Sequence, residues 1–208
     1  MRGNLFIVSA PSGTGKTALV AALLEKNPGL HLSISYTTRE KRSTEVEGIH
    51  YFFTDEAGFL AMQDREDFLE SAQYKGNLYG TRHQFVENSL STGQDVILEI
   101  DVQGAQQVKA RIPESVGIFL LPPSRQELER RLRNRARETG ETEEDIQRRL
   151  ALAHREVSYY RDYDHIIINE VFEDSLALLQ AVVQCHATSL DHQAERIEGI
   201  IASFGGAR

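Results

Sequence analysis

The order of strands and helices along the chain predicts an α/β fold, a parallel sheet with helices on both faces. Two observations support this prediction. Short apolar runs bounded by turn residues are typical of buried strands, and they alternate with longer segments whose apolar residues recur at helical spacing. The four strand candidates are residues 5–8, 95–101, 116–121 and 165–168.

A long helical segment is predicted at residues 125–161. Ser124 and Glu127 form a capping-box pattern at its start, and a break is expected near Gly140. The other helices predicted from apolar spacing are residues 17–26, 85–90 and 174–186.

Residues 36–90 depart from this alternation. Leu32, Ile34 and Tyr36 alternate with serines, which is typical of a half-buried strand, and residues 49–53 are aromatic and β-prone. Short strands without long helices between them predict an insertion into the parallel sheet.

Composition limits the classes of function. The chain has 208 residues, which fits one domain or one domain with an insertion. Its 23 basic and 31 acidic residues give a net charge of −8, which argues against a general binder of nucleic acid or anionic membranes. The longest apolar run, residues 18–24, is far shorter than the roughly 20 residues of a membrane helix. Cys185 is the single cysteine, so no internal disulfide can form and we expect a cytoplasmic protein.

The strongest chemical signal is a phosphate-binding loop after the first strand. The segment APSGTGKT matches G-x-x-x-x-G-K-[ST], with Ala10 in place of the first glycine. Gly13 and Gly15 let backbone N–H groups approach phosphate oxygens, and the following helix directs its positive end at the anion. Lys16 would reach the β- and γ-phosphates, and Thr17 would supply a hydroxyl to Mg²⁺. The flanking strand and helix favour a P-loop NTPase fold over an ordinary glycine-rich turn.

Acidic residues end the strand at 95–101. In P-loop enzymes an acid such as Asp101 holds Mg²⁺ through its water shell, although aspartate is also a common turn former. Glu99 lies two residues earlier on the same face of the strand. Gly104 fits a close approach of the backbone to the site.

Residues 125–149 concentrate positive charge in an otherwise acidic chain. Most of these arginines are expected on a solvated helix face beside glutamates. A polar hairpin with few apolar residues cannot bury itself well, so we predict a mobile lid in which one or two arginines reach the transferred phosphoryl group. The eight candidates are Arg125, Arg130, Arg131, Arg133, Arg135, Arg137, Arg148 and Arg149.

A second anion site is suggested by the loop that follows Ser35. Arg39 and Arg42 lie three residues apart, and with Tyr51 and Tyr79 they could clamp a second phosphate. On this stretch alone, a surface charge run is the simpler interpretation. The seven histidines and the cysteine lack metal-ligand spacing, so no structural zinc is expected.

Taken together, these motifs resemble the guanylate kinase family over about residues 4–188. The set is far more specific than a phosphate loop alone. The segments that carry the resemblance are APSGTGKT at 10–17, SYTTR at 35–39, GIHYFF at 48–53, FLE at 68–70, YGT at 79–81, EIDVQGA at 99–105, FLLPPS at 119–124, RRL at 148–150 and IIN at 167–169.

The resemblance implies transfer of the ATP γ-phosphoryl group to GMP, with dGMP as an expected further acceptor. It implies that Glu70 accepts hydrogen bonds from guanine N1–H and the 2-amino group, a donor pair that adenine lacks. The implied GMP-binding residues are Ser35, Arg39, Arg42, Tyr51, Glu70, Tyr79, Thr81, Glu99 and Asp101.

The resemblance also implies an ATP site, with Mg²⁺ held by Thr17 and Asp101, partly through water. The lid is a few residues longer than is usual in the family, which makes Arg137 an alternative to Arg135. The implied ATP-binding residues are Ala10, Pro11, Ser12, Gly13, Thr14, Gly15, Lys16, Thr17 and Asn169. The implied catalytic residues are Lys16, Arg39, Arg135 and Arg149.

The sequence departs from the family pattern beside the GMP phosphate. The family often has His, Pro and Gly where Tyr36, Lys41 and Thr44 stand, so the loop there is expected to differ. The resemblance divides a single domain over 1–208 into a core of about 1–34, 93–124 and 162–190, a GMP-binding subdomain of about 35–92, a lid of about 125–161 and a tail of 191–208 that fits either a last helix or a frayed end.

Two other functions are compatible with this fold. One is a catalytically inactive guanylate-kinase-like module that binds proteins, but such modules typically have a degraded phosphate loop and here Lys16 and Thr17 are present. The other is a kinase for a different nucleoside monophosphate, which Glu70, Ser35 and Thr81 disfavour. The expected partners are ATP and GMP, with no nucleic acid and no membrane, and homo-oligomer formation is left open.

Overall fold

A five-stranded parallel sheet forms the centre of the protein. The computed structural model describes residues 2–74 and 76–205. The strands lie in the order β2-β7-β1-β8-β9, and every neighbouring pair is parallel. Their bounds are β1 (Leu5–Ser9), β2 (Leu30–Leu32), β7 (Asp95–Glu99), β8 (Val116–Leu121) and β9 (His165–Ile168).

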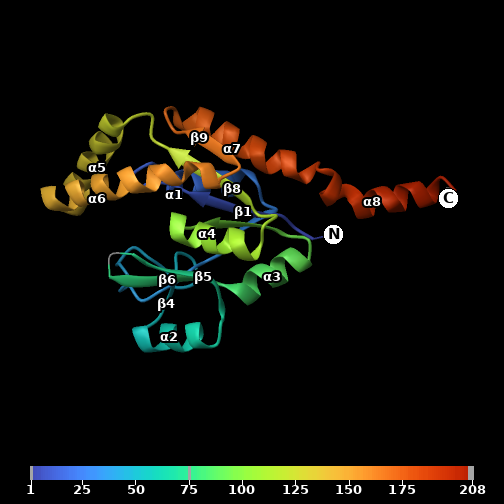
Figure 1. The fold of residues 1–208 in the computed structure, drawn as a ribbon, viewed down its shortest axis with the longest axis horizontal. Helices are drawn as coiled ribbons and strands as arrows, with labels where there is room; N and C mark the ends of the chain where they lie inside the picture. Colours follow the sequence, from blue (N-terminus) through green and yellow to red (C-terminus); the bar gives the residue numbers. More distant parts are fainter. Residues whose placement is uncertain (1, 75, 206–208) are drawn as a thin grey trace.

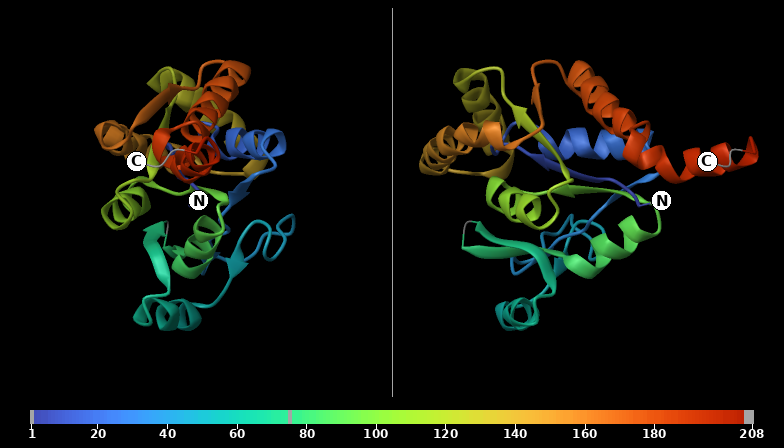
Figure 2. Two further views of the ribbon diagram at one scale, coloured as in Figure 1. Left: turned by 90° about the vertical axis from the view of Figure 1, so that its right-hand side faces the viewer. Right: turned by 45° about the vertical axis from the view of Figure 1, so that its right-hand side comes forward.

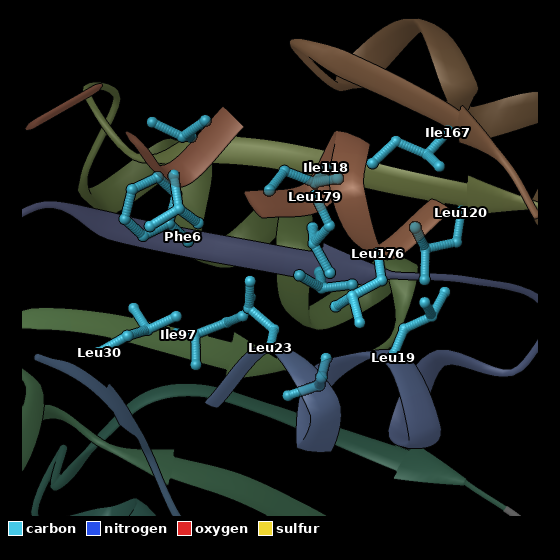
Figure 3. Close-up of a cluster of buried hydrophobic side chains, with 14 residues drawn as sticks. Phe6, Leu19, Leu23, Leu30, Ile97, Ile118, Leu120, Ile167, Leu176 and Leu179 are labelled. Carbon is cyan, nitrogen blue, oxygen red and sulfur yellow. The ribbon is translucent and has the colours of Figure 1, made fainter. Parts of the chain in front are cut away.

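The alternation of side chains along the strands divides the core into two clusters. Phe6 and Val8 of β1 point to one face of the sheet, and Leu5 and Ile7 point to the other. Ten of the fourteen buried residues that form the first cluster are labelled in Figure 3. Because both faces are buried, β1 is apolar along nearly its whole length, as the sequence predicted.

Helices cover both faces, so the predicted α/β architecture is confirmed (Figure 1). The first cluster lies under α1 (Lys16–Lys26) and α7 (Phe172–Ala187). The second lies under α3 (His83–Ser91) and α4 (Val102–Arg111).

The insertion predicted at residues 36–90 forms a second, four-stranded mixed sheet in the order β4-β3-β6-β5. It lies below the central sheet in both views of Figure 2, on the side of α3 and α4. Its elements are β3 (Tyr36–Thr37), β4 (Phe52–Phe53), α2 (Glu56–Asp64), β5 (Phe68–Tyr74) and β6 (Asn77–Arg82).

The predicted long helical segment is a hairpin of α5 (Arg125–Thr139) and α6 (Glu143–Glu156), followed by a 3₁₀ helix η1 (Val157–Asp162). The break falls at Gly140, which has a positive φ of 72° and ends α5. Ser124 caps α5 through the backbone N–H of Glu127, whereas the reciprocal capping box belongs to Thr142 and Asp145 at the start of α6.

The expectation that this hairpin cannot bury itself was wrong. Apolar residues spaced by three or four along each helix meet across the hairpin and form a core cluster of their own. The cluster consists of Leu128, Leu132, Ala136, Ile146, Leu150 and Ala153.

A final helix, α8 (Leu190–Ser203), extends away from the sheet beyond α7 (Figure 1). The tail is therefore helical over these residues. None of the helices in the described ranges is long and apolar enough to cross a membrane.

Candidate active site

The predicted phosphate loop joins β1 to α1 at the carboxyl edge of the central sheet. Gly13 and Gly15 have φ values of 94° and 99°, a region that side chains with a Cβ rarely adopt. A Cβ on Gly15 would also lie 2.9 Å from Nδ2 of Asn169. Both glycines are therefore required by the backbone geometry of the loop.

Lys16 and Thr17 reach across to the end of β7. The Lys16 ammonium donates to the carbonyl oxygen of Ile100 at 2.8 Å, and the Thr17 hydroxyl donates to Oε1 of Glu99 at 2.5 Å. Asp101 caps α4, its Oδ1 accepting from the backbone N–H of Gly104 at 2.8 Å. The phosphate loop and the acidic residues predicted to act with it thus lie together.

Glu70 reaches the first turn of α4 from the insertion. It is 3% exposed on β5, and Thr81 of β6 donates its hydroxyl to Oε1 at 2.6 Å. A Cβ on Gly104 would lie 2.5 Å from Oε2 of Glu70, so the close approach predicted at this glycine is an approach to the carboxylate. Burial raises the pKa of Glu70 to about 7, and the charge of Asp101 acts in the same direction.

Arg39 lies within an aromatic and acidic cluster on the insertion. Its Nη2 donates to Oε1 of Glu45 at 2.7 Å, and its guanidinium carbon lies 5.4 Å from the ring centroid of Tyr51 and 5.8 Å from that of Phe53. The rings of Tyr51 and Tyr79 meet edge to face at 5.9 Å. Burial lowers the pKa of Arg39, but the hydrogen bond and charge of Glu45 outweigh it and the net change is a rise.

Arg42 and Ser35, which were also implied to bind GMP, lie within the insertion and at its start. The side chain of Arg42 is 64% exposed, and its Nη1 lies 3.8 Å from Oε1 of Glu45. Ser35 lines a small hollow of about 40 Å³ together with His50, Tyr51 and Glu99.

Arg149 of α6, which the resemblance implied as a catalytic residue, contacts the phosphate loop. Its side chain is 6% exposed, and Nη1 donates to the Ser12 hydroxyl at 2.6 Å. The other end of its guanidinium pairs with Glu141. Arg135 and Arg137, by contrast, are exposed on α5, so the choice between them stays a prediction.

Asn169 follows β9 and is also bound to the loop. Its side-chain amide donates to the carbonyl oxygen of Thr14 at 2.7 Å, and the residue is buried. Arg131 holds the same region from α5, donating to the carbonyl oxygens of Thr14 at 3.1 Å and Asn169 at 2.9 Å.

Three residues in the site were not singled out from the sequence. Arg131 was one of eight candidate arginines, and its place nearly two turns after the start of α5 could have favoured it. Glu45, which pairs with Arg39, had no motif to mark it. Glu156, at the end of α6, is 7% exposed, and burial raises its pKa to about 7, although the charge of Lys16 acts in the opposite direction.

Comparisons with known proteins decide the family. The model of the guanylate kinase family matches residues 2–186. A guanylate kinase of Chromobacterium violaceum is 47% identical over 205 residues, which cover 99% of this chain and 96% of that protein. A guanylate kinase of Shewanella denitrificans is 50% identical over 183 residues, covering 88% and 87% of the two chains.

The chain belongs to the guanylate kinase family. The resemblance stated from the motifs is confirmed. The crystal structure of guanylate kinase from Anaplasma phagocytophilum has the same fold, with a TM-score of 0.81 at 29% identity, and the match covers 100% of this chain and 98% of that one. The family model ends at residue 186, so α8 lies beyond the part that the guanylate kinase model describes.

Within this guanylate kinase fold, the described residues include no group of three or more His, Cys, Asp or Glu side chains placed to hold a metal by themselves. The oxygen donors near Lys16 include the Thr17 hydroxyl and the carboxylates of Glu99 and Asp101. Hydroxyl and carboxylate oxygens suit Mg²⁺, which keeps several of its own waters and takes one or two protein ligands beside the substrate phosphates.

Proposed function

We propose that this chain transfers the γ-phosphoryl group of ATP to the phosphate of GMP, giving ADP and GDP, and that the predicted site residues carry out this reaction. Membership of the guanylate kinase family supports the activity. The observation that carries the residue roles is that two segments converge on the end of β7 and the first turn of α4. Lys16 and Thr17 reach residues 99–100 from the phosphate loop, and Glu70 reaches Gly104 from the insertion.

The turn between β7 and α4 therefore lies between a donor site and an acceptor site. In the donor site, backbone N–H groups of the loop and the Lys16 ammonium would bind the ATP phosphates. Asn169 and Arg131 fix the loop from outside through Thr14, and Asn169 would also contact the adenine base. Arg149 reaches the tip of the loop at Ser12 and would neutralise charge on the transferred group, with Arg135 as a second candidate.

In the acceptor site, Glu70 would select the base. Its carboxylate can accept from guanine N1–H and the 2-amino group, and Thr81 and Ser35 would contact the base edge. A base without that donor pair would leave the buried carboxylate unmatched, which can cost orders of magnitude in rate. Arg39, Arg42, Tyr51 and Tyr79 would bind the GMP phosphate. The residues assigned to the acceptor do not include a group that would distinguish a 2′-hydroxyl, so we include dGMP as an acceptor.

Mg²⁺ would accompany ATP in this site. Thr17 and Asp101, with Glu99 beside them, would hold the ion partly through water, and the ion would supply positive charge to the phosphates. The residues named here need only bind, orient and exclude water, because a phosphate monoester with a second pKa near 6 is already a nucleophilic dianion at neutral pH.

The experiment that tests the proposed function is a coupled ADP-release assay with ATP and Mg²⁺. We expect strong release with GMP and dGMP, and little with AMP, CMP, UMP or no acceptor. Strong release with another monophosphate would contradict the role given to Glu70. Binding of GMP without any turnover would favour the protein-binding module instead. The cytoplasmic location stays a prediction.

A further inference from the structure

The strand that carries Glu70 has one edge without a neighbouring strand. β5 is the last strand in the order β4-β3-β6-β5, so within the described residues its outer edge pairs with no other strand. A strand edge presents backbone N–H and C=O groups that need partners where they are buried. Helix α4, which also packs on β1 of the central sheet, lies against β5 (Figure 1).

Two side chains of α4 bind the backbone of β5. Gln107 forms a pair of hydrogen bonds with Ser71: its Oε1 accepts from the backbone N–H at 3.1 Å, and its Nε2 donates to the carbonyl oxygen at 2.8 Å. Nη1 of Arg111 donates to the carbonyl oxygens of Phe68 at 2.6 Å and Leu69 at 2.9 Å. The side-chain amide of Gln107 thus takes the place of a neighbouring strand.

These contacts bracket Glu70 along β5. They hold the residues directly before and after it, and the register with β6 shifts between Phe68 and Glu70. A bulge of this kind bends a strand and redirects a side chain. Gly104, Gln107 and Arg111 are three and four residues apart, so one face of α4 carries the partners of β5 and the glycine that the Glu70 carboxylate approaches.

We propose that Gln107 is a positioning residue for selection of the base, and that it fixes β5 on α4 so that the Glu70 carboxylate stays at Gly104. The inference deepens the proposed function and rests on the acceptor role given to Glu70. A carboxylate accepts from the two guanine donors with good geometry only in a narrow range of positions, so a small displacement of the strand weakens both hydrogen bonds. Loss of Gln107 should therefore affect the use of GMP and leave the ATP site unchanged.

The test compares Gln107→Ala with Gln106→Ala in the full-length protein. The two glutamines are neighbours on one helix, but the side chain of Gln106 donates to Oδ2 of Asp162 at 3.1 Å and not to β5. Gln107→Ala should lower kcat/KM for GMP about tenfold, because the two hydrogen bonds that hold the strand beside Glu70 are lost. The KM for ATP and the kcat/KM for AMP should each change less than about twofold. Gln106→Ala should leave all three values within about twofold of those of the unaltered protein.

A double-mutant cycle separates positioning of Glu70 from a general role in covering the edge of β5. If Gln107 acts through Glu70, then Gln107→Ala should lower kcat/KM for GMP by less than about twofold in a protein that already carries Glu70→Gln. A general structural role would lower it by the same factor in both backgrounds, because the strand edge is present in both. If Gln107→Ala does not fold, Gln107→Met serves the same purpose, since it nearly keeps the volume of the side chain and removes both hydrogen bonds.

Four results would overturn the proposal: an unchanged kcat/KM for GMP, an equal loss for GMP and AMP, a matching rise in the KM for ATP, or equal factors in the two backgrounds of the cycle. GMP-dependent ADP release by the unaltered protein is measured in the same experiment. Its absence would contradict the proposed function, whereas its presence with a kcat/KM for GMP that does not respond to Gln107 would contradict this inference alone.

Discussion

The proposed donor and acceptor halves of the site are built by different means. The phosphate loop acts mainly through backbone groups, fixed by two glycines with positive φ and by side chains that bind the Thr14 carbonyl from outside. The acceptor half acts through side chains, which are paired with one another inside the insertion: Glu70 with Thr81, and Arg39 with Glu45. Substitutions should therefore affect the two halves separately.

The lysine of the donor loop should give the largest effect. Lys16→Ala removes the charge placed for the β- and γ-phosphates, so we expect kcat to fall by about 10³-fold. Affinity for GMP should stay within about twofold, because Glu70 and Arg39 lie in the other half. Steady-state assays give kcat, and calorimetric titration gives the GMP affinity. A Lys16→Ala variant whose kcat does not fall would contradict the assignment of Lys16 to the ATP phosphates.

The acceptor carboxylate should affect stability as well as selection of the base. The pKa of Glu70 is raised by burial from 4.5 to about 7 in the folded protein, so the folded state binds the proton more tightly than the unfolded chain does. The contribution of Glu70 to the unfolding free energy is therefore present below about pH 4.5 and falls by about 3 kcal/mol as the pH rises to 7. Glu70→Gln cannot ionise and should lack this fall.

Denaturant unfolding of the unaltered protein and of Glu70→Gln between pH 4.5 and 8 measures this difference. The curves should diverge as the pH rises, with the variant gaining relative stability. Glu144→Gln, an exposed control, should follow the unaltered protein. Parallel curves for Glu70→Gln would show that this carboxyl ionises normally.

The sequence predicted the donor half better than the acceptor half, and the reason is physical. A phosphate loop needs glycine at fixed spacing between a strand and a helix, so its backbone geometry leaves a local pattern in Gly13 and Gly15. Glu45 pairs with Arg39 within an irregular loop between β3 and β4, and Glu156 is one of several glutamates in the helical hairpin, so no sequence pattern marks either residue. Family resemblance alone singled out Glu70, because one glutamate in a strand carries no signal of its own.

The sequence also did not show which side chains of the helical hairpin face the site. Arg131 and Arg135 lie one turn apart on α5, and their spacing alone gives both the same face. Arg131 is nearer to the end of β8, and the structure places it on Thr14 and Asn169. The packing of the hairpin was missed for a similar reason, because its apolar residues are few but six of them lie on the two facing stripes.

The selection of GMP over AMP should also depend on Glu70. Glu70→Gln replaces one acceptor oxygen with a donor, which opposes one of the two guanine donors. We expect the ratio of kcat/KM for GMP over AMP to fall by about 10²-fold, with the KM for ATP unchanged. Competition between the two acceptors in one assay measures the ratio. An unchanged ratio would contradict the base-recognition role while leaving the donor half unaffected.

The smallest effects separate two arginines within the acceptor half. The side chain of Arg39 is 17% exposed and lies against Tyr51, so Arg39→Ala should raise the KM for GMP at least tenfold and deprive Glu45 of its closer guanidinium partner. The side chain of Arg42 is 64% exposed, where water screens its charge, so Arg42→Ala should raise that KM by about threefold. Equal effects would mean that the two side chains become equally buried when GMP binds. A matching rise in the KM for ATP would mean that the halves are not independent, and the contrast between a backbone-built donor site and a side-chain-built acceptor site would then fail at the turn that joins them.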